Sequence, residues 1–453
     1  MRPDTIVAPI TAWGHSSVGI VRLSGGTALE ILGNIFTPKN KKNLRKCASH
    51  TIHYGHIHDG KTLVDEVLVF LMRRPRSYTR EDTVEISSHG GPLIIRQILE
   101  LCLKNGARLA EPGEFTKRAF LNGRIDLVQA EAVADLISAK SEQAIKASAK
   151  QLEGGLSDEV AKIRSKILVA AAALNASLDF PEDDIKWNTA KTKKSLSDSC
   201  IGTKKILAGF ETGRKLREGV KIVIVGKTNV GKSSLINALS QTERAIVTPV
   251  PGTTRDVLRE PLLLKGIPAE LYDTAGLRKN ARGIIEKMGM QKTRDAIGEA
   301  NAIIFLFDAS RKLDEKDFNI MKLLKELAKN TLMVGNKTDL GKIPPSKRFG
   351  IFRTYISCLN GKGIASLKDR LAGFFTKGMI LPKDAVILTN VRHAKIFRAV
   401  LNNVSEAIPK IEENPSVCAV LLEDSLAELD KLTGRTFRED MLNEIFSTFC
   451  IGK

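Results

Sequence analysis

The chain of 453 residues lacks the long hydrophobic runs of a membrane protein. No stretch approaches the roughly eighteen consecutive apolar residues that a membrane-spanning helix needs. The beginning, Met1-Arg2-Pro3-Asp4, also lacks the basic and apolar regions of a signal peptide. These absences predict a cytoplasmic location and no association with a membrane.

Cysteine and aromatic residues are also scarce. The six cysteines show no C-x-x-C spacing, which fits a reducing compartment better than a disulfide framework or a zinc site. Aromatic residues make up 5% of the chain, and isolated ones such as Tyr78 do not form a stacking platform for nucleic-acid bases. A length of 453 residues predicts two to four domains, each able to bury a core.

Positive charge is abundant. Lysine and arginine number 70 against 51 acidic residues, which gives a formal net charge of +19. Such an excess favours a polyanionic partner, although a basic surface is as often only solvated. Five lysines lie close together in one region of helical pattern: Lys191, Lys193, Lys194, Lys204 and Lys205.

A phosphate-binding motif lies near the middle of the chain. The apolar, β-branched run from Val220 to Val225 is followed at once by Gly226-Lys227-Thr228-Asn229-Val230-Gly231-Lys232-Ser233 and a helical pattern through Leu239. This order predicts a strand, a P-loop and a helix. A chance Gly-rich turn is the alternative, and the eight-residue match in a strand-to-helix context argues against it.

The residue types in this motif suit a nucleoside triphosphate. Gly226 and Gly231 let the backbone turn tightly, so that its N–H groups surround phosphate oxygens beside the positive end of the following helix. We expect Lys232 to reach the β- and γ-phosphates and Ser233 to bind a magnesium ion.

Two further motifs resemble the switches of a GTPase. Pro251-Gly252-Thr253-Thr254 offers a threonine that completes the magnesium shell when the γ-phosphate is present, and Thr254 is our choice for that role. Asp273-Thr274-Ala275-Gly276 follows a strand pattern from Ala269 to Tyr272. Its carboxylate can hold magnesium through water, and the N–H of Gly276 can sense the γ-phosphate.

The base is predicted to be guanine. Asn336-Lys337-Thr338-Asp339 follows an apolar stretch from Thr331 to Val334, and Asp339 can accept hydrogen bonds from the N1–H and amino groups of guanine. Alone, this motif is as often a solvated loop; its position after the other motifs favours base recognition. Ser357-Cys358-Leu359 is a loose version of the last guanine-contacting loop.

The catalytic residues depart from those of small GTPases. Leu277 and Arg278 follow Gly276, where small GTPases place a glutamine that orients water. Glu286 is the best carboxylate for that task, although a solvated helix charge explains it equally well. Asn229 is positioned to turn an oxygen towards a monovalent cation between the β- and γ-phosphates, where positive charge accelerates hydrolysis by about a thousandfold or more.

Together with these motifs, several separate stretches resemble the MnmE (TrmE) family of tRNA modification GTPases, and the resemblance runs from Asp4 to Lys453. Family-like segments include Gly19-Ile20-Val21-Arg22-Leu23-Ser24-Gly25, Ser88-His89-Gly90-Gly91-Pro92, Pro112-Gly113-Glu114-Phe115-Thr116, Arg118-Ala119-Phe120-Leu121-Asn122-Gly123 and the ending Phe449-Cys450-Ile451-Gly452-Lys453. One departure is the turn Trp13-Gly14-His15-Ser16-Ser17, where relatives tend to have proline and glycine.

The resemblance implies an activity. Family members work with an FAD-dependent MnmG/GidA-type partner, as a heterotetramer, to add a carboxymethylaminomethyl or aminomethyl group to the wobble uridine of certain tRNAs. The carbon comes from methylene-tetrahydrofolate (or formyl-tetrahydrofolate), bound by an N-terminal domain that also forms the homodimer. Residues of this chain that match the folate site are Arg22, Glu85, Arg124 and Lys453; Glu85 suits the pterin N–H groups, and the basic side chains suit the glutamate tail.

The resemblance also implies potassium activation. Asn229 matches the cation-binding asparagine and Glu286 the water-positioning glutamate. The cation loop Val247-Thr248-Pro249-Val250-Pro251 differs in carrying two prolines, which fix φ at two positions. We expect catalysis by Glu286, Lys232 and Thr254, magnesium bound by Ser233 and Thr254, and potassium bound by Asn229, Thr248, Val250 and Thr253. The residues expected to bind GTP are Asn229, Val230, Gly231, Lys232, Ser233, Ser234, Thr248, Pro249, Val250, Pro251, Gly252, Thr253, Thr254, Asp273, Thr274, Ala275, Gly276, Asn336, Lys337, Asp339 and Ser357.

The predicted fold class is multidomain α/β and α. Residues 1–118 mix short strand patterns with one helix from Pro92 to Lys104, which indicates an α+β domain, and the resemblance makes it tetrahydrofolate-binding and dimer-forming. Residues 119–214 and 378–453 show helical periodicity, as in Leu127 to Leu152, and form a discontinuous helical domain. Residues 215–377 form an inserted Ras-like P-loop GTPase domain with a doubly wound sheet, since the ends of such a domain often lie close together.

Two residue types leave alternatives open. Cys450 is either a nucleophile that attacks a pyrimidine carbon or a thiol packed in a terminal segment. His50, His53, His56 and His58 precede Asp59-Gly60 in a predicted hairpin; we expect them to be solvated rather than to bind a metal, since only His56 and His58 share a strand face.

Two rival functions share parts of this pattern. A ribosome-assembly or RNA-binding GTPase needs the nucleotide motifs and the basic charge but not the N-terminal domain or the segment from Cys450 to Lys453. A folate-dependent one-carbon enzyme needs only the first domain. The match along the whole chain argues against both.

Overall fold

The computed structural model describes residues 4–179, 188–240, 259–273, 295–327, 330–341, 353–376 and 387–453. The chain divides into two compact units. The first unit contains Met1–Ala134, Gln151–Ala161 and Leu426–Lys453, and the second contains Asp135–Lys150 and Lys162–Ser425. The first unit therefore joins the two ends of the chain. The predicted domain limits at residues 118, 214 and 377 stay predictions.

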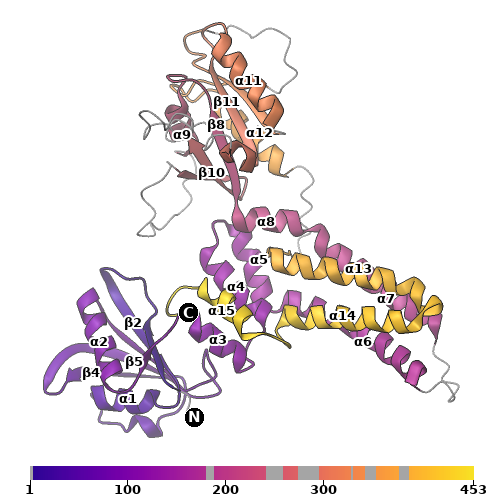
Figure 1. Ribbon diagram of the computed structural model, residues 1–453. Coiled ribbons are helices and arrows are strands. Elements are labelled where there is room, and N and C mark those ends of the chain that lie inside the picture. Colours follow the sequence, from indigo (N-terminus) through magenta and orange to yellow (C-terminus); the bar gives the residue numbers. More distant parts are fainter. Residues whose placement is uncertain are drawn as a thin grey trace, which may run out of the picture. The chain divides into compact units, whose positions relative to one another are not determined.

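A seven-stranded sheet forms the base of the first unit, with strand order β3-β4-β5-β6-β2-β1-β7 (Figure 1). All neighbouring strands are antiparallel except β1 and β7, which are parallel. The strands are β1 (Ile6–Pro9), β2 (Ser16–Ser24), β3 (Phe36–Pro38), β4 (Thr51–Asp59), β5 (Thr62–Met72), β6 (Thr83–Gly90) and β7 (Arg108–Leu109).

Alternation along the strands decides which sheet face is covered. Val21 and Leu23 of β2 and Val84 and Ile86 of β6 are fully buried and share a core with helices α1 (Ala28–Ile35) and α2 (Pro92–Lys104). Because successive strand residues point to opposite faces, the intervening Arg22 and Glu85 lie on the other face. The bounds of α2 confirm the predicted helix.

Helix α3 (Glu114–Leu121) packs on that other face, where Phe115 shares a buried cluster with Ile6 and Ala8 of β1. An ion network holds the helix there. Glu114 accepts hydrogen bonds from Arg108 at 2.6 Å and from Arg118 at 2.9 Å. Burial alone would raise the pKa of Glu114, but these arginines outweigh it and lower the pKa.

The histidines of β4 differ in part from the expectation of solvated side chains. The prediction of a solvated side chain is wrong for His53, which is buried at 6% exposure, with its ring 2.8 Å from the hydroxyl of Thr51. Its pKa is lowered, mainly by burial and also by the positive charge of Lys42. The side chains of His56 and His58 are partly exposed. Within the described residues, no group of three or more His, Cys, Asp and Glu side chains is arranged to hold a metal.

The helical part consists of α4 (Leu127–Ser138), α5 (Glu142–Leu152), α6 (Gly155–Asp179), α7 (Thr189–Ala208), α8 (Phe210–Glu218), α13 (Val391–Glu413), α14 (Pro415–Thr433) and α15 (Glu439–Ser447). The helical pattern from Leu127 to Leu152 does not form one continuous helix, so that prediction is wrong. The helix is interrupted between α4 and α5, where the hydroxyl of Ser141 accepts a hydrogen bond from the N–H of Ala144 and so caps α5.

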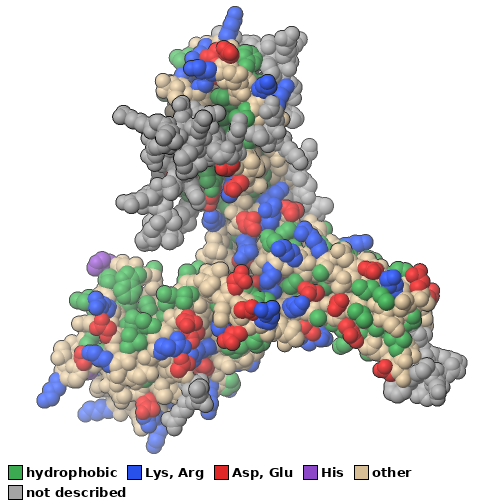
Figure 2. Space-filling model, in the orientation of Figure 1, with side chains coloured by type: hydrophobic (Ala, Val, Ile, Leu, Met, Phe, Trp, Pro, Cys, Tyr) green, Lys and Arg blue, Asp and Glu red, His purple; other side chains and the backbone are tan. Residues whose placement is uncertain are grey.

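Helix α7 carries the predicted lysine group and packs against α13 within the second unit. Lys193 is paired with Glu412 at 2.7 Å, while Lys191, Lys194, Lys204 and Lys205 are exposed. On the visible face, basic and acidic side chains of the described residues are interspersed (Figure 2). The net positive charge is therefore not gathered into one continuous patch on this face. No helix in the described ranges is long and apolar enough to cross a bilayer.

The second sheet has six strands in the order β13-β12-β11-β8-β10-β9, all parallel except the edge strand β9 (Figure 1). This order confirms the doubly wound sheet, since β8 lies between β10 and β11. The strands are β8 (Val220–Val225), β9 (Arg259–Leu264), β10 (Ile267–Asp273), β11 (Ala302–Asp308), β12 (Thr331–Asn336) and β13 (Arg353–Tyr355), and the helices are α9 (Lys232–Ser240), α11 (Glu315–Leu327) and α12 (Ile364–Thr376).

Candidate functional site

The phosphate loop joins β8 to α9, as the sequence predicts. A Cβ atom on Gly226 would lie 2.3 Å from the carbonyl oxygen of Leu306, and one on Gly231 would lie 2.3 Å from the side-chain amide of Asn336. Gly231 has φ of 96° and Asn229 has φ of 62°, a left-handed conformation that asparagine tolerates better than most residues. These contacts explain why both glycines are needed.

Lys232 is already oriented within this loop. Its side chain is buried at 7% exposure, and its Nζ donates to the carbonyl oxygens of Gly226 at 3.0 Å and Lys227 at 2.7 Å. Val230 is fully buried, whereas Asn229, Ser233 and Ser234 are exposed around the N-terminus of α9. The loop thus presents hydroxyl groups and a helix N-terminus to one place, an arrangement suited to an anion.

Asn336, at the end of β12, ties together three loops. Its side-chain amide donates to the carbonyl oxygen of Val230 at 3.0 Å, and its Oδ1 accepts from the N–H of Cys358 at 3.1 Å. Asn336 is 3% exposed. A buried amide with both ends satisfied fixes the base-binding loops against the phosphate loop.

The other guanine-site candidates lie next to Asn336. The hydroxyl of Ser357, itself fully buried, donates to Oδ1 of the exposed Asp339. Lys337 donates to Asp308 at 2.9 Å. The carboxylate of Asp339 thus stands at the surface with one oxygen oriented by Ser357. The structure therefore brings Asn336, Lys337, Asp339 and Ser357 together beside the phosphate loop.

Asp308 and Cys358 are two neighbours of this site. Burial alone would raise the pKa of Asp308, but hydrogen bonds from Ser310 and Lys337 lower it. Burial and the charge of Asp339 raise the pKa of the Cys358 thiol to about 11. Cys358 is therefore an uncharged thiol at neutral pH, and its N–H is the group that serves the site.

Asp273 ends β10 and is 3% exposed. Many of the remaining nucleotide-site predictions lie outside the described residues and are untested. They are Thr248, Pro249, Val250, Pro251, Gly252, Thr253, Thr254, Thr274, Ala275, Gly276 and Glu286.

A second group of candidate residues gathers in the first unit. Arg22 and Glu85 are directly opposite each other on β2 and β6, and their side chains form an ion pair at 2.8 Å. The guanidinium of Arg22 lies 5.3 Å from the ring centre of Tyr78, and that of Arg124 lies 4.6 Å from the same ring. Tyr78 therefore gathers two basic side chains that are far apart in sequence.

The C-terminal segment lies against the start of α3. The carbonyl oxygen of Cys450 accepts the N–H of Gly113 at 3.3 Å, and that of Lys453 accepts the N–H of Phe115 at 3.1 Å. The first turn of a helix has no internal acceptors for its N–H groups, so the segment caps α3. Phe115 in turn lies 5.5 Å from the guanidinium of Arg22. Phe115 therefore contacts the backbone of Lys453 through its N–H and the Arg22 guanidinium through its ring.

Two glycines make this close approach possible. Gly113 has φ of 69°, and a Cβ atom there would lie 2.7 Å from the carbonyl oxygen of Phe446; Gly452 has φ of 93°, and a Cβ atom there would lie 2.4 Å from that of Pro9. Phe449 is buried with Phe446 at a ring separation of 5.2 Å. Cys450 is an exposed residue, which does not favour a thiol packed in the segment, and its role as a nucleophile stays a prediction.

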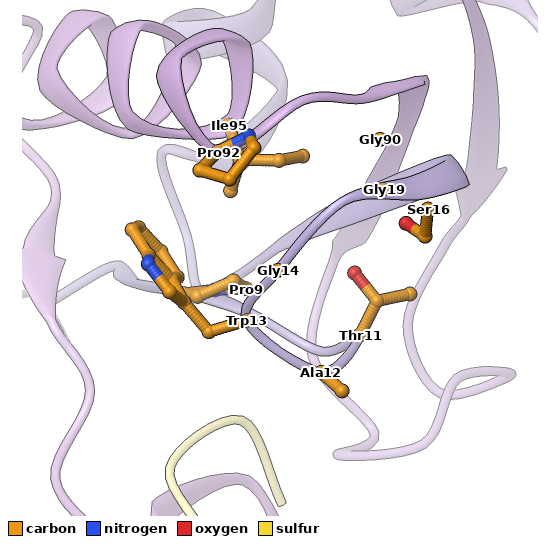
Figure 3. Close-up of a pocket in the computed structure, with 10 residues that line it drawn as sticks. All are labelled: Pro9, Thr11, Ala12, Trp13, Gly14, Ser16, Gly19, Gly90, Pro92 and Ile95. Carbon is orange, nitrogen blue, oxygen red and sulfur yellow. The ribbon is translucent and has the colours of Figure 1, made fainter. Parts of the chain in front are cut away.

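The turn that contains Trp13 lines a small cavity with Gly19, Gly90, Pro92 and Ile95 (Figure 3). The cavity of about 10 Å³ holds about one water molecule and has none of the four folate candidates in its wall. Trp13 itself is 63% exposed. This cavity is too small to be a cofactor site.

Three neighbours of the candidate sites are not indicated by the sequence patterns. Tyr78 is an isolated aromatic residue, Asp308 belongs to no recognised motif, and Lys227 lies in the phosphate loop without a role of its own. The sequence does contain a signal for Asp308. It follows an apolar strand pattern, as Asp273 and Asn336 do, and the ends of neighbouring parallel strands lie together at the ligand-binding edge of the sheet.

The doubly wound sheet, the phosphate loop and the adjoining segment from Asn336 to Asp339, which carries the base-binding candidates, are those of a P-loop GTPase. The family model "MnmE helical domain" matches residues 127–450, and the model "GTP-binding protein TrmE N-terminus" matches residues 5–124. The chain therefore belongs to the MnmE family of tRNA modification GTPases.

Curated relatives match along their whole length. The proteins named tRNA modification GTPase MnmE from Alkaliphilus oremlandii and Thermoanaerobacter pseudethanolicus are 45% and 44% identical to this chain, with 99% of each chain covered. The protein of that name from Carboxydothermus hydrogenoformans is 43% identical, with 100% of both chains covered. A solved G domain of the T. maritima FeoB iron transporter is 28% identical over 34% of this chain and 98% of its own, with a TM-score of 0.27, too low for a structural comparison.

Replacement of Asn336 by Asp tests the link between the loops. The carboxylate still accepts the N–H of Cys358 but faces the carbonyl oxygen of Val230 without a donor, and a buried unmatched charge costs at least about 1–3 kcal/mol. We expect GTP affinity, measured by equilibrium titration, to fall by about ten- to a hundredfold. Asn330→Asp, at an exposed position, is the matched control, and equal affinities of the two variants would contradict the prediction.

Proposed function

We propose that this protein is a GTP-hydrolysing enzyme of tRNA modification that acts in the cytoplasm with an FAD-dependent MnmG/GidA-type partner. It adds a carboxymethylaminomethyl or aminomethyl group to C5 of the wobble uridine of certain tRNAs, using a carbon from methylene-tetrahydrofolate. The protein acts as a homodimer and joins the partner in a heterotetramer. The names of the curated relatives support the substrate class.

The observation that carries the folate proposal is the convergence in the first unit. Arg22, Glu85 and Arg124 come from three separate segments and meet around Tyr78, next to the segment that ends at Lys453. A carboxylate among basic and aromatic groups suits a pterin, whose ring stacks and whose N–H groups bind the carboxylate. The basic groups suit the negative glutamate tail.

In the GTPase domain, we propose that Lys232 binds the β- and γ-phosphates and that Asp339 reads the guanine. Ser233, with its exposed hydroxyl in the first turn of α9, and Thr254 bind magnesium, which neutralises charge on the phosphates when bound. Glu286 positions the attacking water. Potassium binds to Asn229 and to the segment that contains Thr248, Val250 and Thr253.

An RNA-binding or ribosome-assembly GTPase without modification activity is the rival function. It gives no reason for a terminal segment that caps α3 beside Arg22 and Phe115. The two proposals differ in the tRNA of cells that lack this protein. Loss of the wobble-uridine modification, measured by mass spectrometry of tRNA nucleosides, supports the modification enzyme, and intact modification supports its rival.

Removal of residues 450–453 should abolish the tRNA modification and leave GTP hydrolysis within about twofold. The segment caps α3 in the first unit, whereas the nucleotide motifs belong to the second. Nucleoside mass spectrometry and phosphate release measure the two activities. Cys450→Ser separates the thiol from the cap: lost modification assigns a chemical role to Cys450, while retained modification assigns the effect to the backbone and Lys453. Loss of GTP hydrolysis on truncation would make the segment purely structural.

Glu85→Gln should weaken tetrahydrofolate binding by at least about tenfold, because it keeps the shape but removes the charge that faces Arg22 and the pterin. Isothermal titration calorimetry of the purified protein measures this affinity. Glu100→Gln removes a carboxylate from the exposed pair with Arg96 and should change nothing. Unchanged affinity in Glu85→Gln would place the folate elsewhere.

Initial GTP hydrolysis should be at least about tenfold faster in potassium chloride than in sodium chloride, since an arginine finger, which places positive charge on the same phosphates, is worth about a thousandfold or more in other GTPases. Asn229→Ala should remove the difference, and Asn330→Ala should retain it. Equal rates in the two salts would rule out the cation mechanism for this protein.

A further inference from the structure

Lys227 makes contacts through both its side-chain ammonium and its backbone carbonyl. Its Nζ lies 2.6 Å from Oδ2 of Asp314 and 2.7 Å from Oδ2 of Asp317, at the start of α11. Its carbonyl oxygen accepts the hydrogen bond from Nζ of Lys232. The side chain of Lys227 is 13% exposed and that of Asp317 is 3% exposed, so the contact with Asp317 is largely removed from water.

The two carboxylates are fixed before they meet Lys227. Oδ1 of Asp314 accepts the N–H groups of Lys316 at 3.0 Å and Asp317 at 3.2 Å, while Oδ2 of Asp317 accepts the N–H of Asp314 at 3.2 Å. This reciprocal pattern is a capping box at the N-terminus of α11. The ammonium of Lys227 therefore binds to a rigid acceptor pair rather than to two free side chains.

Charge also favours a permanent contact. Burial alone would lower the pKa of Lys227, but Asp314 and Asp317 outweigh it and raise the pKa. The hydrogen bond from Lys227 lowers the pKa of Asp314 to about 2. Oδ1 of Asp317 is buried without a hydrogen-bond partner among the described residues. Loss of the ammonium would leave the Asp317 carboxylate without its counter-charge, which is costly in a buried place.

The connection between β11 and α11 also contacts the loop that carries the base-binding candidates. Asp308, at the end of β11, accepts the hydrogen bond from Lys337, and Asp314 follows six residues later at the start of α11. The connection from β11 to α11 thus contacts the phosphate loop through one lysine and the guanine loop through another. Lys227 is linked to Lys232 through its own carbonyl oxygen, which is one of two backbone acceptors of the Lys232 ammonium, with that of Gly226.

We propose that Lys227 is a positioning residue for GTP binding, which acts through Asp317 and Asp314 by fixing the carbonyl oxygen that orients Lys232. The side chain points at the cap of α11 and not at a phosphate. Lys232 is proposed to bind the phosphates in bound GTP as well as during hydrolysis, so the loss of Lys227 weakens both states alike and raises KM more than it lowers kcat.

The test is the steady-state kinetics of GTP hydrolysis by the full-length protein. Lys227→Met should raise KM for GTP by about tenfold with kcat within about twofold, and Lys227→Arg should restore KM to within about threefold. Asp317→Asn keeps the acceptor for the N–H of Asp314 but loses the charge, and it should raise KM like Lys227→Met. The double variant should be no worse than Lys227→Met alone, because both changes break one interaction.

Lys265→Met is the matched control, since Lys265 forms a solvent-exposed pair with Asp369 at 3.0 Å in the same domain. It should leave KM and kcat unchanged. An unchanged or lower KM in Asp317→Asn would overturn the proposal, because Lys227 would then act on the nucleotide directly. A fall in kcat at constant KM would overturn it as well. If Lys227→Met melts below the assay temperature, Lys227→Arg and Asp317→Asn still decide the question.

Discussion

The buried amide of Asn336 is the interaction on which the nucleotide site depends. A single side chain reaches a carbonyl of the phosphate loop and an N–H of the loop proposed to contact guanine last. Both partners are backbone groups, so the distance between the phosphate loop and this loop is fixed by covalent geometry and two hydrogen bonds. Gly231 leaves no space for a side chain between its backbone and this amide, so the phosphate loop packs directly against Asn336.

In the first unit the link is made by backbone atoms instead of a side chain: carbonyl groups of a segment distant in sequence cap a helix. The N-terminus of α3 would expose unsatisfied N–H groups, and carbonyl oxygens from the C-terminal segment accept two of them. Buried Phe446 and Phe449 add apolar contact beside α3. The helix that positions Phe115 is therefore complete only when the two ends of the chain meet.

Local motifs allowed much of this structure to be predicted. The strand from Val220 to Val225, the helix from Pro92 to Lys104 and the glycines at 226 and 231 follow from rules that act within a few residues. The break at Ser141 was missed because apolar periodicity continues across it. Tyr78 and Lys227 were missed for another reason: their roles depend on partners 46 or more residues away, Arg124 and Asp314, which no local pattern indicates.

The exposure of the cysteines has a practical consequence. Cys102, Cys200 and Cys418 are buried, Cys47 and Cys358 are partly covered, and Cys450 is exposed. In the reduced protein, a thiol-reactive spin label or dye therefore reaches the capping segment of α3 first. A reporter can be attached there without engineering a new cysteine. Its mobility would show whether the C-terminal segment stays bound to α3 while GTP is hydrolysed in the other unit.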